Sequence, residues 1–147
     1  MKNHDLSAQQ VRDLRALAGF IIPPSATYDV PGADDERIFA DILRSLERDR
    51  DDIARALDDL ASLAGGGFAE HEPARRAEVA TQLRETGGAP LTALVRVVLL
   101  CYYRDDRVMR SLGLEPRPPF PQGHVVEQGD WSLLDPVRAR SPFWRRA

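Results

Sequence analysis

Cysteine is nearly absent from this sequence, since Cys101 is the only one. A disulfide within the chain is therefore excluded, and so is a structural zinc site built from several thiolates. Long apolar segments are also missing, because the longest run, Val97 to Tyr103, falls far short of the ~20 residues that a membrane-spanning helix needs. Cys101 lies within this run, which favours a buried apolar role over that of a reactive thiol.

An export signal is missing as well. The amino-terminal residues Met-Lys-Asn-His-Asp are followed by no apolar stretch. The paired arginines, Arg75-Arg76 and Arg145-Arg146, stand in the wrong places for a twin-arginine signal. We therefore expect a cytoplasmic protein, which would reach the periplasm only if a partner carried it there.

A strong excess of charge of one sign is also lacking. The 147 residues have a formal net charge of −3, with 43% hydrophobic and 29% charged residues. This balance is ordinary for a globular protein, and it gives no electrostatic reason to expect binding to nucleic acid or to an anionic membrane. The length is sufficient for one domain with a core of its own.

Helical periodicity accounts for most of the chain, and no strand-like alternation of useful length interrupts it. A capping box at Ser7 predicts a first helix from Ala8 to Ile21, and Asp34 or Asp35 is expected to cap a second. The charge run 47–52 predicts a break near residue 49 and a solvated surface. Later helices are expected to end at the glycines 65–67, to run from Pro73 to Gly87, to begin at Pro90, and to run from Asp105 or Asp106 to Gly113.

The helix that begins at Pro90 carries apolar residues over more than half of its circumference, with Arg96 and Arg104 as its only charges. This pattern predicts the central, most buried helix of the fold. The apolar residues are Leu91, Leu94, Val95, Val98, Leu99 and Tyr102.

The last part of the chain has a different composition. Six of the eleven prolines and both tryptophans lie in residues 116–147. Disordered segments are poor in large aromatic residues, whereas aromatic residues commonly anchor interfaces. We therefore predict an all-α protein, with a compact bundle of five to six helices in residues 1–115 and an extended, proline-rich tail in residues 116–147 that binds a partner. Folding of the tail onto its own helical body is the alternative.

Residues with obvious catalytic or metal-binding spacing are not found. His71-Glu72 begins like a zinc-protease helix, but Arg75 stands where the second histidine ligand is needed. The glycines 65–67 follow a helix rather than a strand, so they do not form a phosphate-binding loop. A Ser–His–Asp arrangement assembled in space would leave no local signature, and no nucleophile elbow supports one.

Two stretches resemble one known family. In residues 20–39 a helix ends in Ile-Ile-Pro-Pro, and Pro-Gly-Ala then precedes a helix that contains Ile-Phe-Ala-Asp-Ile-Leu. Residues 102–113 contain a Tyr-Tyr pair, an aspartate, a short helix and Leu-Gly, before the proline-rich tail. In this order, with helices between them, the two motifs resemble the small, non-flavin subunit of gluconate 2-dehydrogenase, the subunit 3 family.

The resemblance implies a helical small subunit without catalytic, cofactor-binding or metal-binding residues of its own. In that family the partner is a large FAD-containing subunit of the glucose–methanol–choline oxidoreductase type, which oxidises an alcohol or sugar hydroxyl. The family usually carries a twin-arginine signal on the small subunit, and this sequence departs from that pattern. Residues carried over in structural roles are Pro23, Pro24, Pro31, Gly32, Tyr102, Tyr103 and Asp105.

The first hypothesis is thus a non-catalytic subunit that stabilises the large flavoprotein or assists its maturation, with FAD bound in the partner and no cofactor in this chain. The alternatives are a stand-alone helical adaptor or chaperone without a redox partner and, with least support, a cofactor-free enzyme. The candidate partner-binding residues are Tyr28, Phe120, His124, Trp131, Leu133, Leu134, Arg138, Phe143, Trp144 and Arg145.

Overall fold

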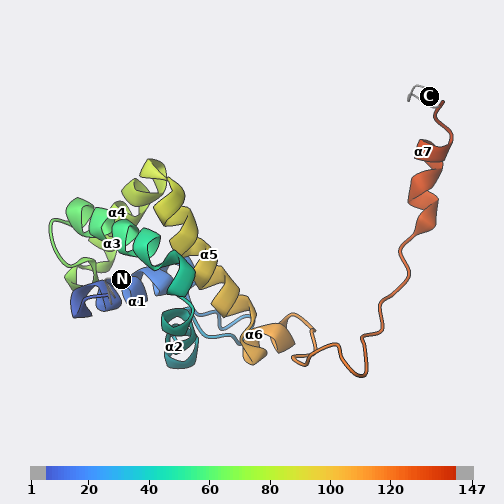
Figure 1. The fold of residues 1–147 in the computed structure, drawn as a ribbon, viewed down its shortest axis with the longest axis horizontal. Coiled ribbons are helices and arrows are strands. Elements are labelled where there is room, and N and C mark those ends of the chain that lie inside the picture. The colour runs from blue at the N-terminus through green and yellow to red at the C-terminus, as the bar shows by residue number, and fades with distance from the viewer. Residues whose placement is uncertain (1–5, 142–147) are drawn as a thin grey trace. The chain divides into compact units, whose positions relative to one another are not determined.

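A computed structural model describes residues 6–141 of the chain (Figure 1). Its contacts divide the chain into two units, with the boundary between Pro116 and Arg117. In the described part of the first unit the regular structure is helical, and the one extended pairing is an isolated bridge between Ser25 and Val30. The all-α prediction is confirmed. The helices of this unit are α1 (Ala8–Ile21), α2 (Glu36–Arg44), α3 (Arg50–Ala64), α4 (Pro73–Thr86), α5 (Ala89–Tyr103) and α6 (Asp106–Ser111).

The helix ends lie where local residue chemistry predicts them. Ser7 and Gln10 form the capping box of α1, and the Asp35 side chain accepts hydrogen bonds from the first amides of α2. Gly65 ends α3 with a φ of 73°, a left-handed conformation that glycine adopts without steric cost. Asp105 caps α6 in the same manner as Asp35 caps α2.

The predicted break in the charge run is confirmed. Helix α2 ends at Arg44, a 3-10 turn spans Glu47–Asp49, and α3 begins at Arg50. The expectation that the run is only a solvated surface is wrong for Asp49, because an Arg96 Nη2 atom of α5 lies 2.7 Å from its Oδ2 atom. This contact ties the turn to α5.

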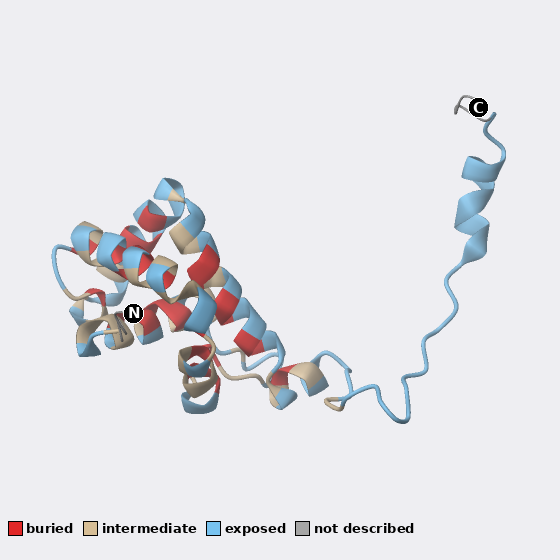
Figure 2. Ribbon diagram, in the orientation of Figure 1, coloured by how far each residue is buried: buried red, intermediate tan, exposed pale blue. Residues whose placement is uncertain are grey.

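Helix α3 lies at the centre of the core. It packs against α1, α4 and α5, and its residues Ile53, Leu57 and Leu60 are fully buried. Figure 2 shows the buried residues on the faces that the helices turn toward one another. The prediction for α5 is therefore only partly correct. One side of α5 is buried in the core, but Leu99 and Leu100 on the other side are exposed.

A buried carboxylate joins α1 to the loop after α3. Asp13 is almost fully buried, and its Oδ1 atom accepts hydrogen bonds from Ala69 N at 2.8 Å and from Gln9 Nε2 at 3.1 Å. The loop continues as a 3-10 turn, Phe68–Glu70, whose Phe68 side chain is fully buried. Asp13 thus supplies an acceptor for a backbone amide that the loop itself leaves unpaired. The sequence analysis did not identify this residue.

The second unit, as far as it is described, contains a 3-10 turn, Trp131–Leu134, and the short helix α7 (Asp135–Arg138). The Asp130 side chain accepts a hydrogen bond from Ser132 N and so caps the 3-10 turn. Residues 118–141 are all exposed.

No single helix within residues 6–141 is long and apolar enough to cross a membrane, although α4 and α5 taken together as a bent pair satisfy the length and composition.

Candidate partner-binding site

The two motifs that carry the family resemblance come together in space. The first motif forms an irregular corner between α1 and α2, which we call the Tyr28 corner (residues 22–35). Within it, Ser25 N and Val30 O lie 3.0 Å apart, and Val30 N and Ser25 O lie 3.1 Å apart. These hydrogen bonds close a small loop that presents Tyr28, whose exposed fraction is 70%.

Glycine suits position 32 because neighbouring groups approach the backbone closely there. A Cβ atom on Gly32 would lie 3.0 Å from Pro24 N and 2.5 Å from an Asp34 carboxylate oxygen. The next residue, Ala33, is fully buried, and its amide donates to Ile22 O at 2.9 Å. The Pro-Pro and Pro-Gly elements thus fold the corner back onto the end of α1.

Arg107 of the second motif connects this corner to α6. Its guanidinium donates to Asp35 Oδ1 at 2.6 Å and to Asp105 Oδ1 at 2.9 Å. These are the two carboxylates that cap α2 and α6, so one arginine ties two helix N-termini together. The hydrogen bonds from Arg107 lower the pKa of Asp35 and of Asp105, and the two carboxylates raise the pKa of Arg107.

Replacement of this arginine should change the pH dependence of stability. Because both aspartates have a pKa below the ordinary ~3.9, their pairing stabilises the fold fully above that pH and is lost as the pH falls through the lowered values. We expect Arg107→Met to reduce the free energy of unfolding by about 2 kcal/mol near neutral pH, the scale of hydrogen bonds to charged groups.

Denaturant unfolding at several pH values measures this effect. The difference in the free energy of unfolding between the native protein and Arg107→Met should shrink as the pH drops below about 4, because protonated aspartates no longer form ion pairs with the arginine. Arg110→Met is the matched control, because the Arg110–Asp106 pair is exposed and its N–O distance is 3.4 Å. A pH-independent difference, or an equal loss in the control, would contradict the role of Arg107.

A hollow of about 840 Å³ lies between the Tyr28 corner and α6. The corner contributes Tyr28 and Pro31 to its lining, and α6 contributes Arg107, Arg110 and Ser111. An aromatic ring, a proline and two guanidinium groups around an open hollow suit a side chain or backbone segment of another protein. The sequence analysis identified Tyr28 as a partner-binding residue but did not include the two arginines.

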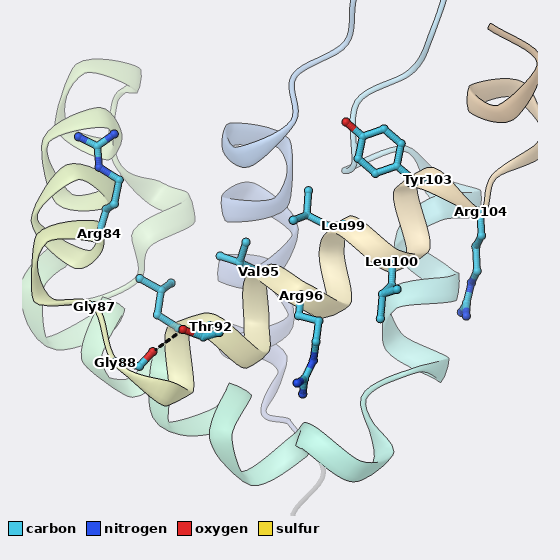
Figure 3. A pocket seen from close by; sticks show the side chains of 11 residues that line it. Arg84, Gly87, Gly88, Thr92, Val95, Arg96, Leu99, Leu100, Tyr103 and Arg104 are labelled. Atoms are coloured by element: carbon cyan, nitrogen blue, oxygen red, sulfur yellow. Dashed lines mark hydrogen bonds between the residues drawn. The ribbon is translucent and has the colours of Figure 1, made fainter. Parts of the chain in front are cut away.

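A second surface lies along α5, and we call it the α5 groove. It has a volume of about 820 Å³ and is lined by the end of α4, the link between α4 and α5, and the open side of α5. Figure 3 shows Val95, Leu99 and Tyr103 projecting from one side of α5, and Arg96, Leu100 and Arg104 from the other. The Arg104 guanidinium also donates to Asp41 Oδ2 of α2 at 2.5 Å.

Cys101 faces the interior rather than this groove. It is almost fully buried, and its burial raises the pKa of the thiol. An Arg104 Nη2 atom lies 3.5 Å from its sulfur. A raised pKa disfavours the thiolate, which agrees with the structural role expected for this cysteine.

Tail residues predicted to bind a partner are exposed where they are described. Trp131 is 62% exposed and Phe120 is 84% exposed, while Leu133 and Leu134 lie on the same short turn as Trp131. An Arg138 Nη1 atom donates to Asp135 Oδ1 at 3.3 Å, and His124 is exposed. The predicted anchors Phe143, Trp144 and Arg145 lie outside the described residues.

No group of three or more histidine, cysteine, aspartate or glutamate side chains in the described part of the chain is arranged to hold a metal ion. His71, which the sequence places beside a glutamate, has its Nε2 atom 3.0 Å from Ala64 O and so contacts the end of α3. No protein-family model matches the chain, and no curated protein or solved structure gives a significant match.

Proposed function

We propose that this chain is the small, non-catalytic subunit of a heteromeric FAD-dependent dehydrogenase of the glucose–methanol–choline type. The large subunit holds FAD and oxidises an alcohol or sugar hydroxyl. The small subunit stabilises that flavoprotein or assists its maturation. Its own residues contribute binding surface rather than chemistry.

The observation that carries this proposal is the junction at Arg107. The two sequence motifs behind the family resemblance are separated by more than sixty residues, yet Arg107 of the second binds Asp35 at the end of the first. The two motifs therefore form one structural unit in this chain. The unit also borders the hollow beside Tyr28, so it combines a rigid base with an exposed surface.

The second support is the amount of exposed apolar surface. Leu100 and Tyr103 on α5, and Trp131 and Leu133 in the second unit, are each more than half exposed. Within each unit, exposed apolar side chains mark candidate sites of protein interaction, and aromatic residues dominate the energy of such sites. In the proposed complex the proline-rich residues 116–147 form an extended arm, which 32 residues could stretch over roughly 100 Å.

Co-expression with a flavoprotein of this type encoded beside the gene tests the proposal. We expect the tagged small subunit to retain the flavoprotein through gel filtration, with an FAD absorbance spectrum in the shared peak. The same chain expressed alone should be colourless. A flavin spectrum from the isolated chain would contradict the non-catalytic role, and absence of any flavoprotein neighbour that binds would favour the stand-alone adaptor.

A further inference from the structure

A pocket of about 330 Å³ lies between three segments that are far apart in the sequence. Its described lining shares no residue with the hollow beside Tyr28 or with the α5 groove. Ligand pockets commonly measure about 300–1,000 Å³, so this one has room for a small organic molecule. The lining residues are Ala16, Gly19 and Phe20 in the second half of α1, Asp34 before α2, and Pro73 and Arg76 in the first turn of α4.

Gly19 makes room for the Asp34 carboxylate against the backbone of α1. A Cβ atom on Gly19 would lie 2.8 Å from Asp34 Cγ and 3.0 Å from its Oδ2 atom. The Arg15 Nε atom holds the backbone at this position by donating to Asp34 O at 3.0 Å. Glycine is less favourable than alanine inside a helix, and here it allows a carboxylate to lie at the wall of the pocket.

Arg76 brings an unpaired guanidinium to the same pocket. Its Nε atom is shielded from solvent and has no hydrogen-bond partner among the described residues. The neighbouring Arg75 is bound instead, since its Nη1 atom donates to Glu78 Oε2 at 3.0 Å and its Nη2 atom donates to Leu63 O at 3.3 Å. The shielded Nε atom places the stem of Arg76 against the protein, which leaves the two Nη groups as donors for a ligand.

The two charges of the pocket do not neutralise each other. Within residues 6–141 no ion pair joins Arg76 to Asp34, and no other side chain pairs with either charged group. A ligand with a single charge would be attracted by one of these groups and repelled by the other. A zwitterion satisfies both, with its carboxylate at Arg76 and its ammonium at Asp34. Phe20, which is 46% exposed, and Pro73 add an apolar part to the lining.

We infer that this pocket binds an α-amino acid with an apolar side chain. The carboxylate of the amino acid accepts hydrogen bonds from the Nη groups of Arg76, and its ammonium group donates to the Asp34 carboxylate. Its side chain lies against Phe20 and Pro73. The inference is independent of the proposed function, because none of these residues is among the candidate partner-binding residues.

L-leucine is the probe, and two of its derivatives separate the two charges. N-acetyl-L-leucine lacks the ammonium group, and L-leucinamide lacks the carboxylate. Proton–nitrogen correlation NMR of the full chain follows the Arg76 Nε–H signal, which is assigned by its loss in Arg76→Lys. We expect leucine to shift this signal saturably, and each derivative to bind at least about tenfold more weakly.

Matched variants locate the binding site. Asp34→Asn keeps the shape of the side chain but removes its charge, and it should raise the Kd for leucine by about tenfold or more. Asp59→Asn is the control, since Asp59 is exposed on α3 and does not line the pocket. Gly19→Ala should also weaken leucine binding, because the added Cβ atom displaces the Asp34 carboxylate. Circular dichroism should show that all three variants remain folded.

Four results would overturn the inference. Absence of a saturable shift with leucine would show that the pocket takes no such amino acid, and equal affinity for leucine and its derivatives would show that the two charges select nothing. Equal effects of Asp34→Asn and Asp59→Asn would place the binding elsewhere. Without leucine, non-additive losses of stability in Asp34→Asn and Arg76→Lys would show that these two residues pair with each other.

Discussion

Deletion of residues 116–147 is expected to leave a folded helical body that no longer co-purifies with the flavoprotein. The buried residues of the described chain end at Val108, so the described core of the first unit is built from residues that the deletion leaves in place. The C-terminal end of α6 also keeps its hydrogen bonds, because Gly113 N and Leu114 N donate to carbonyls of α6. The far-ultraviolet circular dichroism per helical residue and a cooperative thermal transition should therefore survive the deletion.

Binding should be lost because the deleted segment carries the largest exposed aromatic anchors. A stable interface buries ~1,200–2,000 Å², and a few residues carry most of its energy. Trp131 is placed at the start of a capped turn together with Leu133 and Leu134, so it presents an apolar cluster rather than a single ring.

The single substitution Trp131→Ala should weaken binding by at least ~2 kcal/mol if this tryptophan is a hot spot. Val125→Ala is the matched control, since Val125 is fully exposed in the same unit and lies outside the turn. Titration calorimetry with the purified flavoprotein measures both.

The deletion has two informative alternative results. If the shortened body unfolds, residues 116–147 belong to its own core and the arm hypothesis is wrong. If it folds and binds at full strength, the interface lies on the helices, and the hollow beside Tyr28 and Arg110 becomes its first candidate. In that case Tyr28→Ala should reduce binding where Trp131→Ala does not.

Local chemistry explains why the helix boundaries could be predicted from the sequence. Ser7, Asp35 and Asp105 act on amides two or three residues away, and Gly65 ends a helix through its own φ. Such signals need no knowledge of the rest of the fold. The same holds for the break after Arg44, where no apolar stripe spans the charged residues.

Contacts between distant residues could not be predicted in this way. Asp13 and Ala69 are 56 positions apart, and Arg107 and Asp35 are 72 positions apart. A single aspartate on an otherwise apolar helix face gives no sign of the loop amide that it accepts. Likewise, an arginine in a charged segment gives no sign of which carboxylate it will meet.

The open side of α5 shows a further limit of periodicity. The pattern of Leu91, Val95 and Leu99 correctly indicates an apolar face, and hydrophobic periodicity reports only that a face prefers to be covered. It does not report whether the cover comes from the same chain. In the first unit α3 packs against one side of α5, and Leu99 on the other side is exposed.

Substitution of Phe68 by alanine should be among the most destabilising single changes in the chain. Phe68 is fully buried on the 3-10 turn after the three glycines, and this turn packs against α1 and α3. Removal of a buried phenylalanine leaves a cavity and costs about 3–5 kcal/mol. That loss is a large part of the 5–15 kcal/mol by which a domain of this size is typically stable.

Phe120→Ala makes the same chemical change at a position that is 84% exposed, so it is the matched control. Guanidinium unfolding should show a strongly lowered midpoint for Phe68→Ala. The free energy of unfolding of Phe120→Ala should stay within about 0.5 kcal/mol of that of the native protein. The order of the two effects should be reversed for flavoprotein affinity, since Phe120 belongs to the proposed arm and Phe68 is inaccessible to any partner. At a temperature where both are folded, Phe120→Ala should weaken flavoprotein binding and Phe68→Ala should not. Equal unfolding midpoints would show that the loop after α3 is not part of the cooperative core.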